Sequence, residues 1–232
     1  MKKIGFTGVF DKTDLMLNIS KILATAKQKV LIVDSTIMQK ARYIVPVIEE
    51  EESYITTFED IDIAVGFDGI EELRSYLKSK GENLDDYHVL LIDADTNKVF
   101  TDFDLKNADI NFFVTSFDLY SLRKGLEVLN ELEVQLPMTK ILFVNDIFNE
   151  EDEYLSYLTA KVYIEWAEER IFFQNNLGDQ KTIIENQRVQ KVKFSNLSSD
   201  YKDSLVMIVQ KILGTKNIAE LKKVVRIIEK GV

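Results

Sequence analysis

Short apolar runs alternate with segments of helical periodicity along almost the whole chain. Most of the runs are rich in Val, Ile, Leu and Phe and lack polar residues at alternate positions, which is typical of strands covered on both faces. They predict strands at residues 3–7, 30–33, 61–65, 88–92, 111–115, 140–144 and 170–173. Helical spacing of apolar residues predicts helices at 13–26, 70–79, 119–132, 179–186 and 199–213. This alternation predicts an α/β fold with a doubly wound, mainly parallel sheet, whose ligands bind at the carboxyl ends of the strands.

The last residues predict one more helix, with an apolar and a basic face. Asn217 followed by Glu220 is a capped helix start, and residues 215–232 carry five basic and two acidic side chains. The apolar positions at helical spacing are Ile218, Leu221, Val224, Val225 and Ile228. We therefore expect a domain at 1–214 and a basic amphipathic helix at 215–232. Packing of its apolar stripe on the domain or on a second subunit is the favoured interpretation, because the stripe lacks a Trp or Phe anchor.

Composition excludes several classes of chemistry. The 232 residues contain no cysteine, so disulfides and thiolate metal sites are excluded, and the single histidine, His88, gives no basis for a His-rich metal cluster or the usual Ser-His-Asp triad. The formal net charge of −10 makes binding to nucleic acid unfavourable, since phosphate contacts need clustered Lys and Arg. The chain opens on a strand pattern and lacks an apolar run of membrane-spanning length, so we expect a cytoplasmic protein.

Polar side chains follow three of the predicted strands. Asp34 ends VLIVD, Asp93 ends VLLID and Asn145 ends ILFVN, while Lys12 and Thr13 follow the first strand. Each Asp or Asn taken alone fits a residue that stops a strand and starts a turn. Taken together, they predict one ligand site at the carboxyl edge of the sheet.

The motifs in this order resemble those of the MinD/ParA group of deviant Walker-A ATPases over nearly the whole length. The family pattern KGGVGKTT corresponds to TGVFDKTD at 7–14, and the family's VLLIDxD and Walker-B strands correspond to VLIVDST and YHVLLIDAD. The segment from 179 to 213 resembles the C-terminal part of atypical members that localise pili or accompany mobile elements. The resemblance implies a P-loop NTPase-like fold, with Lys12 on phosphate, Thr13 and Asp93 around magnesium, and Asn145 at adenine. The candidate cofactor-binding residues are Gly8, Asp11, Lys12, Thr13, Asp34, Asp93 and Asn145, with Thr13 and Asp93 as metal ligands.

The same resemblance implies how such a protein would act. Family members position or assemble larger bacterial machines through protein partners, and they dimerise across the nucleotide edge, so a homodimer is implied. Their C-terminal helix can bind lipid, which leaves open a peripheral contact of residues 217–230 with the inner face of the membrane.

Departures from the family pattern determine the expected chemistry. Asp11 replaces the glycine before Lys12, and like charges about 4 Å apart repel by roughly 4 kcal/mol at an effective dielectric near 20. Thr7 replaces the signature lysine, and Thr36 replaces the second acid of VLLIDxD. We expect either no cofactor or weakly bound ATP and magnesium, and we assign no catalytic residue. In the nucleotide-free interpretation, Lys12 is solvated and Asp11 caps the helix or fills the anion site itself.

Three hypotheses follow. The first is a positioning or assembly protein with an eroded phosphate loop and little or no ATP hydrolysis. The second is an active but atypical ATPase that cycles between membrane or DNA and the cytosol. The third is a receiver-like or flavodoxin-like signalling domain in which Asp34 or Asp93 is the functional acid, although length and motif order fit it poorly.

Overall fold

An eight-stranded sheet forms the centre of the molecule in the computed structural model, which describes residues 1–47, 51–132, 134–144 and 153–231. The strands are β1 (Lys2–Thr7), β2 (Val30–Asp34), β3 (Tyr54–Phe58), β4 (Ile61–Val65), β5 (Val89–Ala94), β6 (Ile110–Ser116), β7 (Pro137–Val144) and β8 (Glu165–Gln174). Their order is β3-β4-β2-β5-β1-β6-β7-β8, and every pairing is parallel except that of β3 with β4. The predicted doubly wound, mainly parallel sheet is confirmed. The flavodoxin-like alternative is wrong, because β1 lies between β5 and β6 rather than between β2 and β3.

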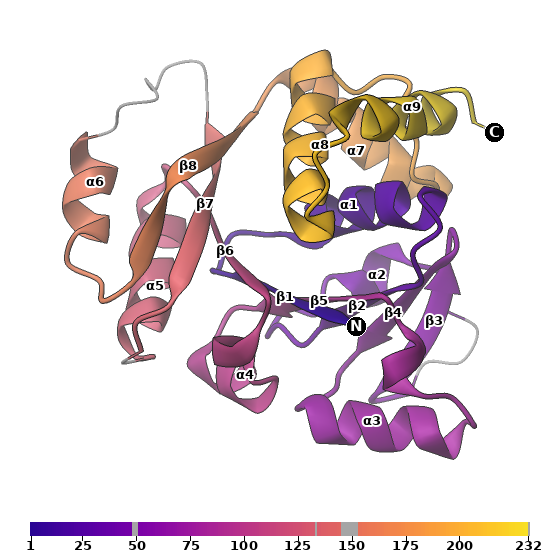
Figure 1. Ribbon diagram of the computed structural model, residues 1–232, viewed down its shortest axis with the longest axis horizontal. Helices are drawn as coiled ribbons and strands as arrows, with labels where there is room; N and C mark the ends of the chain where they lie inside the picture. The colour runs from indigo at the N-terminus through magenta and orange to yellow at the C-terminus, as the bar shows by residue number, and fades with distance from the viewer. Residues whose placement is uncertain (48–50, 133, 145–152, 232) are drawn as a thin grey trace.

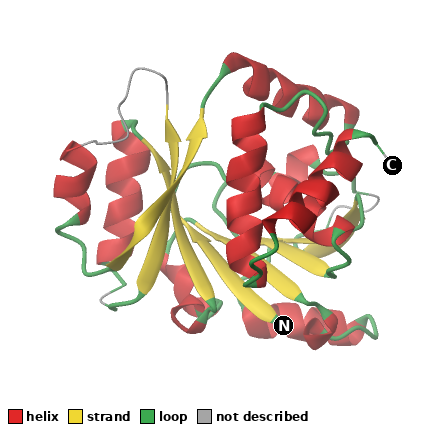
Figure 2. Ribbon diagram, turned by 45° about the horizontal axis from the view of Figure 1, so that its top comes forward, coloured by secondary structure: helices red, strands yellow, loops and turns green. Residues whose placement is uncertain are grey.

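Helices cover both faces of this twisted sheet (Figures 1 and 2). They are α1 (Thr13–Thr25), α2 (Ala41–Ile44), α3 (Ile70–Ser79), α4 (Asn97–Asp102), α5 (Leu119–Asn130), α6 (Glu153–Thr159), α7 (Leu177–Val189), α8 (Ser199–Leu213) and α9 (Ile218–Glu229), with short 3-10 turns at Leu84–Asp86 and Leu105–Asn107. Neighbouring strand residues supply opposite cores: Ile32 belongs to the core that α1 and α8 cover, whereas Val33 belongs to the core that α3, α4 and α5 cover. Burial on both faces explains why the central strands lack polar alternation.

Sequence periodicity located the long elements within a few residues and missed the short ones. All seven predicted strands and all six predicted helices, including the C-terminal one, are present, and two of those helices, α3 and α8, have the predicted bounds. Strand β3 was missed. Its sequence, YITTF, places partly exposed residues at its centre, and it is an edge strand paired only with β4. Helices α2, α4 and α6 have four, six and seven residues, too few to establish a helical period.

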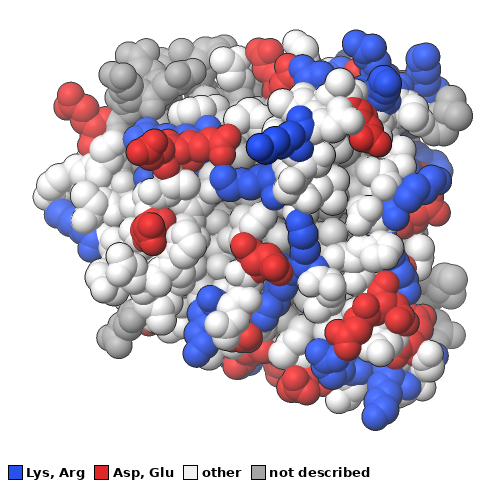
Figure 3. Space-filling view, viewed as in Figure 1, with Lys and Arg blue, Asp and Glu red and all other residues white. Residues whose placement is uncertain are grey.

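Helix α9 packs its apolar stripe within the chain. Asn217 caps it by accepting a hydrogen bond from the Glu220 N–H at 3.2 Å, as the sequence predicted. Leu221, Val225 and Ile228 are buried in the core that α1 and α8 share, so the packing interpretation of the stripe is confirmed. Lys and Arg side chains gather on the surface over the α7–α9 part of the molecule (upper right of Figure 3). Within the described residues, no helix combines the length and hydropathy needed to cross a bilayer.

Candidate functional site

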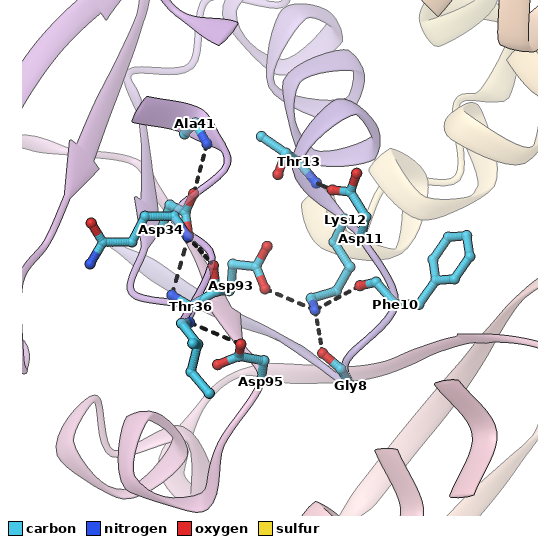
Figure 4. Close-up of polar contacts among 12 residues, drawn as sticks. Gly8, Phe10, Asp11, Lys12, Thr13, Asp34, Thr36, Ala41, Asp93 and Asp95 are labelled. Carbon is cyan, nitrogen blue, oxygen red and sulfur yellow. Dashed lines mark hydrogen bonds and ion pairs between the residues drawn. The ribbon is translucent and has the colours of Figure 1, made fainter. Parts of the chain in front are cut away.

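A cavity of about 220 Å³ opens at the carboxyl edge of the sheet, where the sequence predicted a ligand site. Segments that follow three neighbouring strands surround it: the loop after β1, the loop after β2 and the end of β5 (Figure 4). Its polar lining is Asp11, Lys12, Thr13, Thr36, Lys40, Asp93 and Asp95, and its apolar lining is Val9, Phe10, Met38 and Tyr43.

Lys12 is buried at the base of this cavity, with 2% of its surface exposed. Its Nζ donates to the carbonyl oxygens of Gly8 and Phe10, the latter at 3.0 Å, and lies 2.9 Å from Asp93 Oδ1. The two carbonyls accept hydrogen bonds, whereas Asp93 Oδ1 accepts none and contacts Lys12 as an ion pair. The solvated Lys12 of the nucleotide-free interpretation is therefore wrong: the side chain turns inward because loop carbonyls and a buried carboxylate compensate its charge.

Gly8 permits the loop that supplies one of those carbonyls. Its φ of +132° lies in the region that favours glycine, and a Cβ at this position would sit 2.3 Å from the Val114 carbonyl oxygen. The backbone therefore crosses closely over β6 before it turns into α1. Thr7, the preceding residue, is fully buried at the end of β1, so its side chain does not reach the surface of the molecule.

Asp93 is the buried acid of the site, with 4% of its surface exposed. Burial raises the pKa of its carboxyl to about 7; Lys12 opposes this shift, and Asp34 and Asp95 add to it. Near neutral pH, the ion pair with Lys12 therefore exists in equilibrium with a protonated Asp93.

Asp11 and Lys40 form a second ion pair at the mouth of the cavity. Asp11 is 48% exposed; its Oδ1 accepts a hydrogen bond from the Thr13 N–H at 3.1 Å and its Oδ2 contacts Lys40 Nζ. Lys40 Nζ also lies 2.9 Å from Asp14 Oδ2. Partial burial opposes ionisation of Asp11, but Lys40 holds the pKa of this carboxyl below its usual value. Asp11 thus bonds to the start of α1, yet it does not fill an anion site at Lys12, because Asp93 is the carboxylate that Lys12 contacts.

Asp34 has a structural role in this arrangement. Its Oδ1 accepts from the Thr36 N–H at 3.2 Å and from the Thr36 hydroxyl at 2.6 Å, and its Oδ2 accepts from the Ala41 N–H at 2.9 Å. These bonds fix the loop that carries Lys40. Asp34 does not line the cavity, although it lies near enough to influence Asp93.

The structure adds Lys40 and Asp95 to the residues that the sequence indicated. Asp95 Oδ2 accepts a hydrogen bond from the Ile37 N–H at 2.9 Å, and burial raises the pKa of Asp95. The alternating acids of DAD at the end of β5 were a visible signal for Asp95, whereas Lys40 lies in a loop without periodicity. Asn145, the candidate adenine contact, lies outside the described residues.

These residues do not fit magnesium triphosphate in the arrangement that they adopt. Lys12 Nζ donates to two loop carbonyls and forms an ion pair with Asp93, and Lys40 is directed at two carboxylates. Three carboxyl groups and two ammonium groups line the cavity, so its lining does not favour a polyanion. Among the described residues, no group of three His, Cys, Asp or Glu side chains could hold a metal ion.

Apolar side chains project from α2 and from the segment between β2 and α2, beside the cavity. Ile37, Met38 and Tyr43 are 78%, 76% and 79% exposed. We call these three residues the edge patch. Large apolar groups exposed together are typical of association surfaces rather than of an isolated monomer.

Comparison with solved structures places this fold among known ones. A chain of the MinC:MinD cell division protein complex of Aquifex aeolicus matches with a TM-score of 0.58 and 15% identity, covering 93% of this chain and 97% of that one. The Aquifex aeolicus MinD cell division protein matches with a TM-score of 0.56 and 15% identity, covering 93% of this chain and 98% of that one. A ParA family ATPase from Chlorobium tepidum matches with a TM-score of 0.56 and 11% identity, covering 91% of this chain and 98% of that one. No protein-family model and no curated protein sequence matches the chain. The chain therefore has the P-loop NTPase fold of the MinD and ParA family ATPases.

Proposed function

We propose that this protein is a positioning or assembly factor that acts through protein association, with little or no ATP hydrolysis. The observation that carries the proposal is that Lys12, the cation that would hold phosphate, is buried and already contacts two carbonyls and a carboxylate. A triphosphate would have to replace Gly8 O, Phe10 O and Asp93 Oδ1 around a side chain that is 2% exposed. Replacing good contacts with equivalent ones yields little net binding energy.

The second candidate, an active but atypical ATPase that cycles between membrane or DNA and the cytosol, is favoured by one observation. Lys40 neutralises Asp11, so the repulsion between Asp11 and phosphate is smaller than the sequence alone suggests. Under this hypothesis, Lys12 and Lys40 would both turn to phosphate when Mg-ATP binds. It predicts phosphate release that Lys12→Ala abolishes.

Restoring the glycine at position 11 tests the phosphate loop directly. Asp11→Gly removes the carboxylate and frees Lys40 from one of its two partners, so we expect Mg-ATP to bind about tenfold to a hundredfold more tightly than to wild type, after allowance for the partial exposure of Asp11. Isothermal titration calorimetry with Mg-ATP measures this change.

Asp11→Asn is the matched control, because it removes the charge and keeps the Cβ. An intermediate affinity would show that charge and shape both contribute. Tight binding of Mg-ATP to wild type, with phosphate release that is lost in Lys12→Ala, would instead support the ATPase.

Self-association through the carboxyl edge is the second part of the proposal. The resemblance implies a homodimer, and the edge patch provides exposed apolar area beside the cavity. We expect Ile37→Glu/Tyr43→Glu to weaken dimerisation at least tenfold, because it places two charges in an apolar contact. Sedimentation velocity with and without Mg-ATP measures it.

Tyr163→Glu is the control for this experiment, since Tyr163 is also exposed but lies before β8, away from the carboxyl edge. A wild-type protein that stays monomeric at all concentrations would contradict dimerisation through this edge. So would a loss of dimer affinity in Tyr163→Glu equal to that in Ile37→Glu/Tyr43→Glu. A dimer that forms only with Mg-ATP would contradict an association uncoupled from nucleotide.

A further inference from the structure

A groove lies between α5 and α6, at the β7–β8 end of the sheet. Its volume is about 510 Å³, and it shares no lining residue with the cavity at the carboxyl edge. The apolar part of its lining is Leu126 from α5 together with Leu158 and Val162 from the α6 region. Leu126 and Val162 are buried and Leu158 is half-buried, so they provide an ordered apolar floor rather than flexible surface side chains.

Two cations border this floor and are held by tyrosines. The Arg123 guanidinium donates to the Tyr154 hydroxyl, with N–O distances of 2.8 and 3.2 Å. Lys161 Nζ donates to the Tyr157 hydroxyl at 2.6 Å and lies 4.0 Å from the centre of that ring. Each side chain therefore contacts a tyrosine at the border of the groove.

Neither cation is paired with a carboxylate in the described part of the chain. Arg123 and Lys161 take part in none of the ion pairs found there. Glu127, the acidic residue of the groove lining, pairs with Lys124 at 2.7 Å. The groove is thus locally positive on a chain whose net charge is −10.

The chemistry of the groove selects its occupant. Unpaired Arg and Lys at a rim complement carboxylates, and Arg and Tyr are the residue types that most often dominate binding energy at interfaces. An apolar floor between the two cations suits one aromatic or aliphatic side chain. A nucleic acid fits poorly, because two cations on an acidic chain compensate few phosphates and the floor offers nothing to a sugar-phosphate backbone.

We propose that the α5–α6 groove binds an acidic segment of a partner protein, a segment in which carboxylates flank an apolar anchor. Arg123 and Lys161 receive the carboxylates, and Leu126, Leu158 and Val162 receive the anchor. The site acts independently of nucleotide and of the edge patch, so its test separates from that of the proposed function.

The test uses the full chain and a fluorescein-labelled peptide of twelve residues, in which Asp and Glu surround a central Phe-Leu pair. Fluorescence anisotropy is expected to show saturable binding to wild type. Arg123→Glu/Lys161→Glu should weaken that binding at least tenfold, because two attractive contacts become repulsive. A peptide with Ser in place of Phe-Leu, and one with Lys in place of every acid, should each bind at least tenfold more weakly.

Lys78→Glu/Lys80→Glu is the matched control. Both residues are exposed on or just after α3, and Lys80 Nζ lies 5.4 Å from the centre of the Tyr76 ring, as Lys161 lies over Tyr157. This variant changes net charge equally and should bind the acidic peptide within twofold of wild type. Urea midpoints of both variants verify that they fold.

Three outcomes would overturn the proposal. They are no binding to wild type at millimolar peptide, equal loss of affinity in the two double variants, and equal affinity for the acidic and Lys-substituted peptides. Loss of a wild-type dimer in Arg123→Glu/Lys161→Glu without peptide would also overturn it, because a second copy of this chain would then be the occupant.

Discussion

Replacing Lys12 with Met should lower the free energy of unfolding by about 3–5 kcal/mol at pH 8.5, and by clearly less at pH 6. At the higher pH, Asp93 is ionised in the wild type, and Lys12 is the cation that compensates it in the buried site. Removing Lys12 leaves an unpaired buried carboxylate, or forces Asp93 to bind a proton at a pH above its wild-type pKa. At pH 6, Asp93 is already largely protonated, so the loss is smaller. Urea denaturation at the two pH values measures the difference.

The sign of the pH dependence follows from the carboxyl of Asp93 itself. Its pKa is about 7 in the folded protein against 3.8 for an ordinary Asp, so the folded state binds an extra proton between these values. The contribution of Asp93 to stability therefore falls as pH rises from about 4 to about 7, and it is constant above. In Lys12→Met, the pKa rises further, and the fall continues into the alkaline range.

Asp93→Asn is the control, alone and combined with Lys12→Met. In the single variant, the decline in stability between pH 4 and 7 should disappear. The double variant should show the same loss of stability at pH 6 and at pH 8.5. If Lys12→Met alone lowers the free energy of unfolding equally at both pH values, the Lys12–Asp93 pair does not determine the stability of this site.

Gly8→Ala should lower the free energy of unfolding by about 3 kcal/mol or more. Two effects combine: a φ of +132° is strained for alanine, and the new Cβ would meet the Val114 carbonyl oxygen at 2.3 Å. That oxygen belongs to the backbone of β6, so it cannot move aside as a flexible side chain would. Urea denaturation measures the cost, and loss of the Gly8 carbonyl position should also weaken the contact with Lys12.

Gly81→Ala separates the two effects. Gly81 has a φ of +79°, and no atom lies within 4 Å of a Cβ built there, so this variant carries backbone strain without a clash. We expect a cost of about 1 kcal/mol. Equal losses of stability in Gly8→Ala and Gly81→Ala would mean that the loop does not approach β6 closely in solution.

Local pattern was sufficient to predict the sheet, because buried strands and long helices leave a period in the sequence. It was also sufficient to bring Lys12, Thr13 and Asp93 to one edge, since parallel strands end together. The pairing of charges was not predictable. Whether Lys12 contacts Asp11, one residue away, or Asp93, on a different strand, depends on side-chain direction rather than on spacing.

Lys40 shows why the electrostatic argument from sequence was incomplete. It lies twenty-nine positions from Asp11, in a segment without hydrophobic periodicity, and the hydrogen bonds that position this segment include three to Asp34. Asp34 was interpreted as a ligand-binding acid, and the structure uses it to hold a loop. That loop then supplies the cation that offsets Asp11.

The apolar side chains with which α9 packs on the domain are the same ones that a lipid surface would contact. Leu221, Val225 and Ile228 cannot insert into a lipid surface while they fill the space between α1 and α8, so any lipid contact through that stripe would require the helix to detach first. Detachment would uncover three aliphatic side chains and the matching parts of α1 and α8, at a cost of several kcal/mol. Bilayer affinity would therefore appear as faster hydrogen exchange in α1, and a mutation that loosens α9 would favour adsorption without touching a basic residue.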